Sequence, residues 1–159
     1  MVRSMRLQKY VFSLLATVVL ATTVEAQGLQ TYDVEFLEIE SEGVRHKFTV
    51  EMALTPAQQT QGLMFRQTMR GDAGMLFLYK QVRYANMWMR NTILPLDMLF
   101  IEATGRISRI VKRTVPQSLE TISSRGPVLA VLELNAGTVE RFGISVGDRV
   151  LHSVFDVGR

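Results

Sequence analysis

Alternating apolar and polar positions mark the first strands of this chain. Residues 44–54 place apolar side chains and His46 at every second position, with polar side chains between them. A period of two residues indicates a β-strand that buries one face. Residues 32–40 are rich in β-branched and aromatic residues, and Glu42-Gly43 supplies a turn between the two runs. The pattern therefore predicts an antiparallel hairpin.

Two segments carry the signals of short helices. Thr55 can cap a helix, Pro56 suits its first turn, and Gln58 completes a capping box. This helix is predicted to end before Gly71. A second helix is predicted over residues 138–142, where a glycine follows the last helical position.

Short apolar runs between turn residues predict the remaining strands, which cover residues 75–79, 96–102, 106–112, 128–134 and 149–155. Residues 114–127 are polar, contain two prolines and predict a mobile loop at the rim of a site. Many short strands with frequent turns are typical of β-rich domains. The expected fold is mainly β (β-rich α+β), a single compact antiparallel barrel-like or strongly bent sheet with two short helices.

The first 26 residues differ in character from the rest. A basic start precedes an apolar run over residues 11–23, and a Val-Glu-Ala tripeptide ends at Ala26. This pattern is typical of a secretory signal peptide. The apolar run is shorter than the roughly 20 residues that span a bilayer, so membrane attachment is expected only if the segment stays uncleaved. We expect a periplasmic or secreted protein with one domain over residues 27–159.

The leader also explains most of the positive charge of the chain. The whole sequence has 18 basic and 15 acidic residues, and the leader holds Arg3, Arg6, Lys9 and Glu25. The remaining 15 basic and 14 acidic residues carry a net charge of +1. Without a cationic cluster, nucleic-acid binding is not expected. The absence of cysteine excludes disulfides, thiolate metal sites and a cysteine nucleophile.

Two acids interrupt apolar strand faces. Asp97 shares its strand parity with Leu99 and Ile101, and Glu133 interrupts the apolar run over residues 128–134. A carboxylate against an apolar face is either paired or has a raised pKa. One interpretation is a pair of acids at one site, for acid–base chemistry or metal binding. The favoured alternative is that each acid forms a structural ion pair, with partners to be sought among Arg66, Arg90 and Arg109.

The segment before Pro95 offers candidate ligand-binding groups. Arg90, Asn91 and Thr92 present a cation, an amide and a hydroxyl, which suit a carboxylate, a phosphate or a sugar, but which can also satisfy their own loop backbone. Trp88 lies between two methionines. A core tryptophan is the favoured interpretation, and an exposed platform for a ligand is the alternative.

Patterns of established cofactor and catalytic sites are missing from the sequence. His46 and His152 lie in different predicted strands, without the spacing of zinc ligands. The sequence also has no Gly-x-Ser-x-Gly elbow and no glycine-rich phosphate loop. We therefore expect neither a bound metal nor a cofactor.

Four ordered blocks of sequence resemble one known family. They are Gly-Leu-Met-Phe-Arg at 62–66, Gly-Met-Leu-Phe at 74–77, Trp-Met-Arg-Asn-Thr with Pro-Leu-Asp at 88–97, and Val-Leu-Glu-Leu-Asn-Ala-Gly at 131–137. The chain resembles the bacterial and archaeal domain of unknown function 192 over residues 34–154. Its members are typically small, often exported or lipid-anchored, and β-rich. The family pattern falls on Met64, Arg66, Met89, Asn91, Thr92, Pro95, Asp97, Glu133 and Gly137.

This chain departs from the family pattern at two places. Arg90 stands where lysine is usual, and Asn86-Met87 precedes Trp88 where an aromatic residue is often found. The second departure weakens the idea of a platform with two rings. The resemblance implies no activity.

Three functions therefore remain open. The favoured one is an exported binding or accessory domain for a small polar or anionic molecule or a cell-envelope component, with the site residues Arg66, Trp88, Arg90, Asn91, Thr92, Asp97 and Glu133. A second is a hydrolase or lyase that uses Asp97 and Glu133 as an acid–base pair. A third is a structural or interaction domain in which these residues form a buried polar network.

Overall fold

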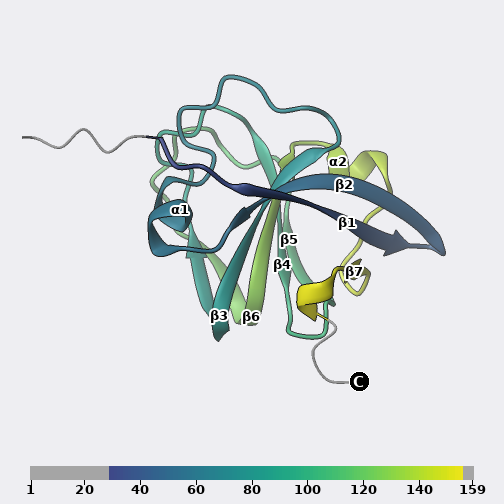
Figure 1. The fold of residues 1–159 in the computed structure, drawn as a ribbon. Helices are drawn as coiled ribbons and strands as arrows, with labels where there is room; N and C mark the ends of the chain where they lie inside the picture. The colour runs from purple at the N-terminus through teal and green to yellow at the C-terminus, as the bar shows by residue number, and fades with distance from the viewer. Residues whose placement is uncertain (1–28, 156–159) are drawn as a thin grey trace, which may run out of the picture.

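A computed structural model describes residues 29–155 of the chain, and the predicted leader lies outside the described residues. This part of the chain forms seven strands, two short helices and a final 3-10 turn, η1 (Figure 1). The elements are β1 (Asp33–Ser41), β2 (Val44–Ala53), α1 (Pro56–Gln61), β3 (Ala73–Met87), β4 (Leu96–Ile101), β5 (Ile107–Val111), β6 (Ile122–Asn135), α2 (Thr138–Arg141), β7 (Arg149–Leu151) and η1 (Ser153–Phe155). Within the described part, no helix is long and apolar enough to cross a membrane.

One curled sheet contains all seven strands in the order β5-β4-β6-β3-β2-β1-β7. The backbone N–H of Ile107 donates to Asp148 (2.9 Å) and that of Val150 donates to Gly105 (2.8 Å). These bonds bring the β7 end of the sheet back to the start of β5, so the sheet forms a half-barrel. The mainly β, strongly bent sheet predicted from the sequence is confirmed.

The prediction of a purely antiparallel sheet is wrong at one pair of strands. β2 and β3 run parallel, from Thr49 opposite Ala73 to Ala53 opposite Phe77. A parallel pair needs a crossover connection. The segment that contains α1 provides it, because it carries the chain back before β3 begins. The hairpin of β1 and β2 is antiparallel, as predicted.

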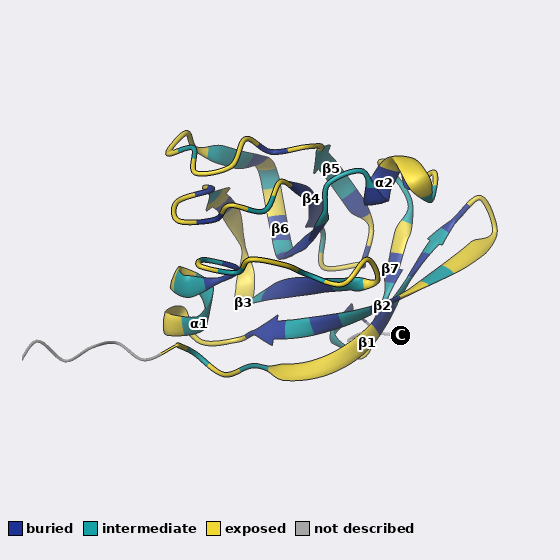
Figure 2. Ribbon diagram, turned by 90° about the horizontal axis from the view of Figure 1, so that it is seen from above, coloured by how far each residue is buried: buried dark blue, intermediate teal, exposed yellow. Residues whose placement is uncertain are grey.

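The sheet buries both faces of its middle strands. One apolar cluster draws buried side chains from all seven strands and fills the inside of the curl. A second cluster, with Met75, Phe77, Met98 and Phe100 among its members, lies on the outer face of β3, β4 and β6. β4 is buried at all six positions, as Figure 2 shows by its dark blue colour. A side chain of β4 or β6 therefore points either into the curl or to the outer face.

Several element boundaries differ from the prediction. β6 begins at Ile122, so the second half of the predicted loop 114–127 is strand. β3 extends to Met87 rather than ending at Tyr79. Two register shifts in the β3–β6 ladder break the alternation on which the prediction depended.

The first helix and the last strand are shorter than predicted. α1 stops at Gln61 because Gly62 has a φ of +49°, which leaves the helical region, and a β-carbon there would lie 2.9 Å from the Phe77 ring. The predicted capping box at Thr55 is confirmed. The final strand ends at Leu151 and continues as η1.

Candidate functional site

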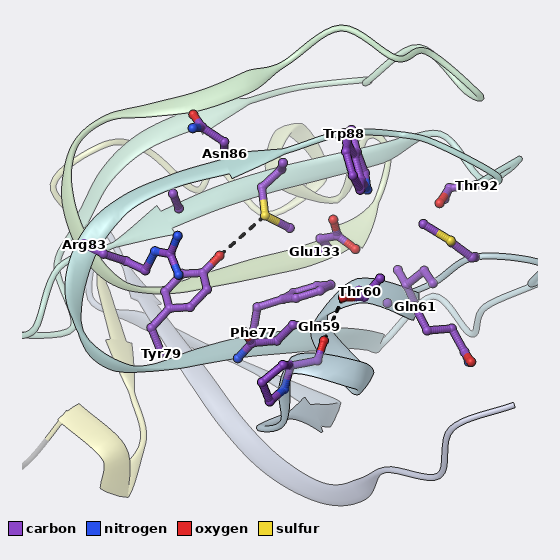
Figure 3. Close-up of a pocket in the computed structure, with 16 residues that line it drawn as sticks. Gln59, Thr60, Gln61, Phe77, Tyr79, Arg83, Asn86, Trp88, Thr92 and Glu133 are labelled. Atoms are coloured by element: carbon purple, nitrogen blue, oxygen red, sulfur yellow. Dashed lines mark hydrogen bonds between the residues drawn. The ribbon is translucent and has the colours of Figure 1, made fainter. Parts of the chain in front are cut away.

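A pocket of about 270 Å³ lies on the outer face of the sheet (Figure 3). α1 and the turn after it form one wall, the far half of β3 forms another, and the loop after β3 forms the rim. The lining residues are Pro56, Gln59, Thr60, Gln61, Gly62, Leu63, Met64, Phe77, Tyr79, Arg83, Ala85, Asn86, Met87, Trp88, Thr92 and Glu133.

Glu133 is the carboxyl group at the base of this pocket. It lies on β6 opposite Met75 of β3 and Met98 of β4, and both neighbours belong to the outer apolar cluster. Its exposed fraction is only 4%. None of the hydrogen bonds or ion pairs found among the described residues involves its carboxyl group. Burial therefore raises the pKa of Glu133 to about 8, so the folded protein holds this side chain largely protonated at neutral pH.

The β3 wall contributes a phenol and a cation. The Tyr79 hydroxyl donates to the Met87 sulfur at 3.6 Å, and the Arg83 guanidinium carbon lies 5.2 Å from the centre of the Tyr79 ring. Burial raises the pKa of Tyr79 to about 12, with Arg83 lowering it and Glu133 raising it. Tyr79 is therefore a neutral hydrogen-bonding group at every physiological pH, and Arg83 is the cation of the pocket.

Trp88 stands beside the Glu133 carboxyl group at the rim (Figure 3). Its side chain is 49% exposed, whereas the adjacent Met89 is 1% exposed. The favoured prediction of a core tryptophan is therefore wrong; the side chain is half-exposed, as a ligand platform would require. An indole face beside a buried carboxyl group offers apolar stacking and a polar contact to the same ligand.

Backbone hydrogen bonds hold the Trp88 loop in place from both sides. Asn91 O accepts from the N–H of Phe65 (2.9 Å), and Thr92 O accepts from the N–H of Gln117 (3.0 Å). Asn91 adopts a φ of +53°, a left-handed conformation that asparagine tolerates better than most residues. Of the three predicted groups in this loop, only Thr92 lines the pocket. Arg90 and Asn91 are exposed outside it.

Asp97 lies on the other face of the sheet. It is opposite Leu134 rather than Glu133, and it shares the inner face with Leu99 and Ile101. One carboxylate oxygen accepts from the N–H of Arg113 (2.9 Å) and the other from the N–H of Val139 (3.0 Å). The structure does not bring Asp97 and Glu133 together, so they cannot act as an acid–base pair.

The Asp97 carboxylate has a structural task. It is 1% exposed and ties the chain after β5 to the first turn of α2, where helix N–H groups lack intrahelical partners. The expected partner of Asp97 was an arginine side chain; the actual partners are two backbone N–H groups.

Arg66 is also separate from the pocket. Its guanidinium donates two hydrogen bonds to the Glu51 carboxylate, which makes a bidentate ion pair on the outer face of β2. The hydrogen bond to Glu51 is the main reason that the pKa of Arg66 is raised. Thus Trp88, Thr92 and Glu133 are brought together, whereas Arg66, Arg90, Asn91 and Asp97 lie elsewhere.

The sequence interpretation overlooked Tyr79 and Arg83. Tyr79 shares the parity of Met75 and Phe77, so its position on the outer face could have been found from the strand pattern. Arg83 lies beyond a register shift, where parity no longer indicates the face. Among the described residues, no group of three or more histidine, aspartate or glutamate side chains is arranged to hold a metal ion.

The sequence of this half-barrel domain matches the model of a known protein family. The model of the family DUF192, described as “Uncharacterized ACR”, matches residues 37–152, and the chain belongs to this family. The resemblance seen in the sequence is thereby confirmed. Comparison with curated proteins gives no match.

Two solved structures share this fold. A candidate transcription regulator from Sinorhizobium meliloti is 48% identical, with a TM-score of 0.78, and the match covers 80% of this chain and 99% of that one. A protein of unknown function from Novosphingobium aromaticivorans is 38% identical, with a TM-score of 0.73, and the match covers 80% of this chain and 89% of that one. Both matches are similar in fold and in sequence.

Proposed function

We propose that this protein is an exported binding domain that takes a small polar ligand in the pocket of Trp88 and Glu133. One observation carries the proposal: a buried carboxyl group without a protein partner lies at the base of an open pocket, beside a half-exposed indole. Buried polar groups are nearly always hydrogen-bonded, so an unpartnered one in a pocket calls for a ligand or an ordered water.

The chemistry of the pocket favours a ligand that donates hydrogen bonds. A hydroxyl or ammonium group would reach Glu133, and a flat apolar face of the same ligand would stack on Trp88. An anionic group next to Glu133 would meet a carboxyl group that must then stay protonated. We therefore place a sugar-like or amine ligand ahead of the anionic alternative.

Catalysis receives less support from the same groups. A carboxyl group with a pKa of about 8 can serve as a general acid or base near neutral pH. Hydrolysis of a glycosidic bond, however, normally takes two carboxyl groups on one site, and Asp97 lies on the opposite face. Glu133 is the only acid that lines the described pocket.

A melting-temperature screen of residues 27–159 tests the binding proposal. The panel contains neutral sugars, amino sugars, primary amines, and simple carboxylates and phosphates. We expect a sugar or amine to raise the melting temperature in a saturable way. We expect Trp88→Ala or Glu133→Gln to lower the affinity for that ligand at least tenfold. Such a loss corresponds to about 1.4 kcal/mol, which is typical of a single stacking or hydrogen-bonding contact.

Arg90→Gln is the matched control for this screen, because Arg90 lies in the same loop but outside the pocket. It should bind the ligand like the unmodified protein. The binding proposal would be abandoned if no sugar or amine gave a saturable shift, or if Arg90→Gln weakened binding as much as Trp88→Ala.

Export is a second part of the proposal and rests on the sequence of the leader. Expression of the full chain in a bacterium with a periplasm should give a periplasmic product that begins at Gln27. Leu15→Arg together with Val18→Arg should keep the chain in the cytoplasm, because charges in the apolar run prevent its recognition as a signal. Cell fractionation and N-terminal sequencing measure both results. A cytoplasmic unmodified product with an intact Met1 would contradict export.

A further inference from the structure

Another hollow lies beside the turn that joins β4 to β5. It has a volume of about 620 Å³ and lies between the β4–β5 turn and a tight turn within β6. Its lining residues are Val82, Glu102, Ala103, Thr104, Ser108, Arg109, Ser124, Arg125, Gly126 and Pro127. None of them lines the pocket of Glu133.

Arg109 has an unsatisfied nitrogen in this hollow. It lies on β5 opposite Phe100, with its guanidinium carbon 5.6 Å from the centre of the Phe100 ring. The Nη1 atom is fully covered and has no hydrogen-bond partner among the described residues. A guanidinium nitrogen removed from water without an acceptor is unfavourable, so the described residues leave the Arg109 side chain incompletely satisfied.

Arg125 supplies a second cation to the same hollow. It adopts a φ of +58°, a conformation that costs free energy for a residue with a side chain. Ser124 fixes the turn, because its hydroxyl accepts from the N–H of Ala85 (3.0 Å) and donates to Gly126 O (2.6 Å). The turn therefore holds Arg125 at the hollow in spite of the strained backbone.

No acid in the hollow neutralises these two arginines. Neither Arg109 nor Arg125 takes part in any ion pair found among the described residues. Glu102, the acid that lines the hollow, pairs instead with Arg106 at 4.0 Å. Burial lowers the pKa of Arg109, and the nearby charge of Arg125 lowers it further because two neighbouring cations repel each other.

We propose that this hollow is a binding site for a phosphate group. One phosphate oxygen would accept from the part of the Arg109 guanidinium that lines the hollow, and a second oxygen would accept from Arg125; the covered Nη1 of Arg109 takes no part in this contact. A dianion between two guanidinium groups replaces their repulsion by two attractions, and guanidinium forks match the geometry of phosphate oxygens. The hydroxyls of Ser108 and Ser124 already donate to Phe100 O and Gly126 O, so the two arginines are the cations that would bind the anion.

Titration of residues 27–159 with inorganic phosphate at constant ionic strength tests the site, with the side-chain Nε–H signals of the arginines followed by NMR. We expect saturable shifts at Arg109 and Arg125. Arg125→Gln should lower the affinity for phosphate at least tenfold. Arg109→Lys keeps the charge but loses the forked donors of the guanidinium group. It should lower the affinity for phosphate severalfold, while the melting temperature stays near that of the unmodified protein.

Arg45→Gln is the control for the loss of one positive charge, because Arg45 pairs with Glu38 and Glu40 on β1, away from the hollow. It should bind phosphate as the unmodified protein does. A parallel titration with glycerol 3-phosphate distinguishes an organic phosphate ester from the free anion. Tighter binding of either one supports the site, and the tighter ligand shows whether the site takes a phosphate ester or free phosphate. Shifts that grow linearly without saturation, equal weakening by Arg45→Gln, or acetate binding as tightly as phosphate would overturn the proposal.

Discussion

Asp97→Ala is expected to lower the free energy of unfolding by about 3–5 kcal/mol, because it leaves the N–H groups of Arg113 and Val139 without an acceptor. Each unsatisfied buried donor costs about 1–3 kcal/mol. The loss also releases the start of α2 from β4. Urea denaturation of residues 27–159 measures this change.

Asp97→Asn should fall between the alanine variant and the unmodified protein. The amide oxygen can accept from one of the two N–H groups, but the amide nitrogen then faces the other donor. Glu140→Gln is the control, because Glu140 meets Arg113 in an exposed ion pair near the same helix. Solvent screens an exposed ion pair, so this control should change the stability little. An Asp97→Ala protein as stable as Glu140→Gln would refute the structural role.

The structural role of Asp97 affects how activity measurements must be interpreted. Typical domains are stable by about 5–15 kcal/mol, so a loss of about 3–5 kcal/mol leaves a domain at the low end of that range partly unfolded. Loss of any function in Asp97 variants would therefore say nothing about chemistry. Trp88, by contrast, is half-exposed and can be changed with little effect on folding.

The sequence pattern was sufficient where positions alternate regularly or where turn residues bound a short apolar run. The β1–β2 hairpin, β4 and the capping box at Thr55 were all predicted because local chemistry determines them. The second half of β3 and the first half of β6 were not predicted, because the register shifts between these two strands change the parity of exposed and buried positions. A pattern of period two cannot continue through an inserted residue.

For a related reason, the sequence could not show whether Asp97 and Glu133 lie at the same site. Each acid interrupts an apolar run, but β4 and β6 are buried on both faces, so parity within one strand does not say which face is inside. Asp97 lies opposite Leu134, and Met98 lies opposite Glu133. A difference of one residue in the register between strands therefore decides whether two acids share a site or lie on opposite faces of the sheet.

The pH dependence of stability is expected to report the buried carboxyl group of Glu133. Its pKa is 4.5 as an unperturbed group and about 8 in the folded protein. Below pH 4.5 the group is protonated in both states and burial carries no penalty. Between pH 4.5 and 8 the unfolded chain loses the proton while the folded protein keeps it, so stability falls as the pH rises. Above pH 8 the loss is complete, and a shift of this size corresponds to about 5 kcal/mol at most.

Glu133→Gln removes the ionisation and retains nearly the same shape. Its free energy of unfolding, measured relative to the unmodified protein, should be near zero at pH 4 and should increase through pH 8 by up to about 5 kcal/mol. Glu120→Gln, an exposed change of the same type, should give a flat difference over the same range. The difference between two proteins cancels the titration of the groups they share, so a rising curve belongs to Glu133. Parallel stability curves for Glu133→Gln and the unmodified protein would mean that Glu133 is solvated or paired. The pocket would then lose the unpartnered acid on which the binding proposal depends.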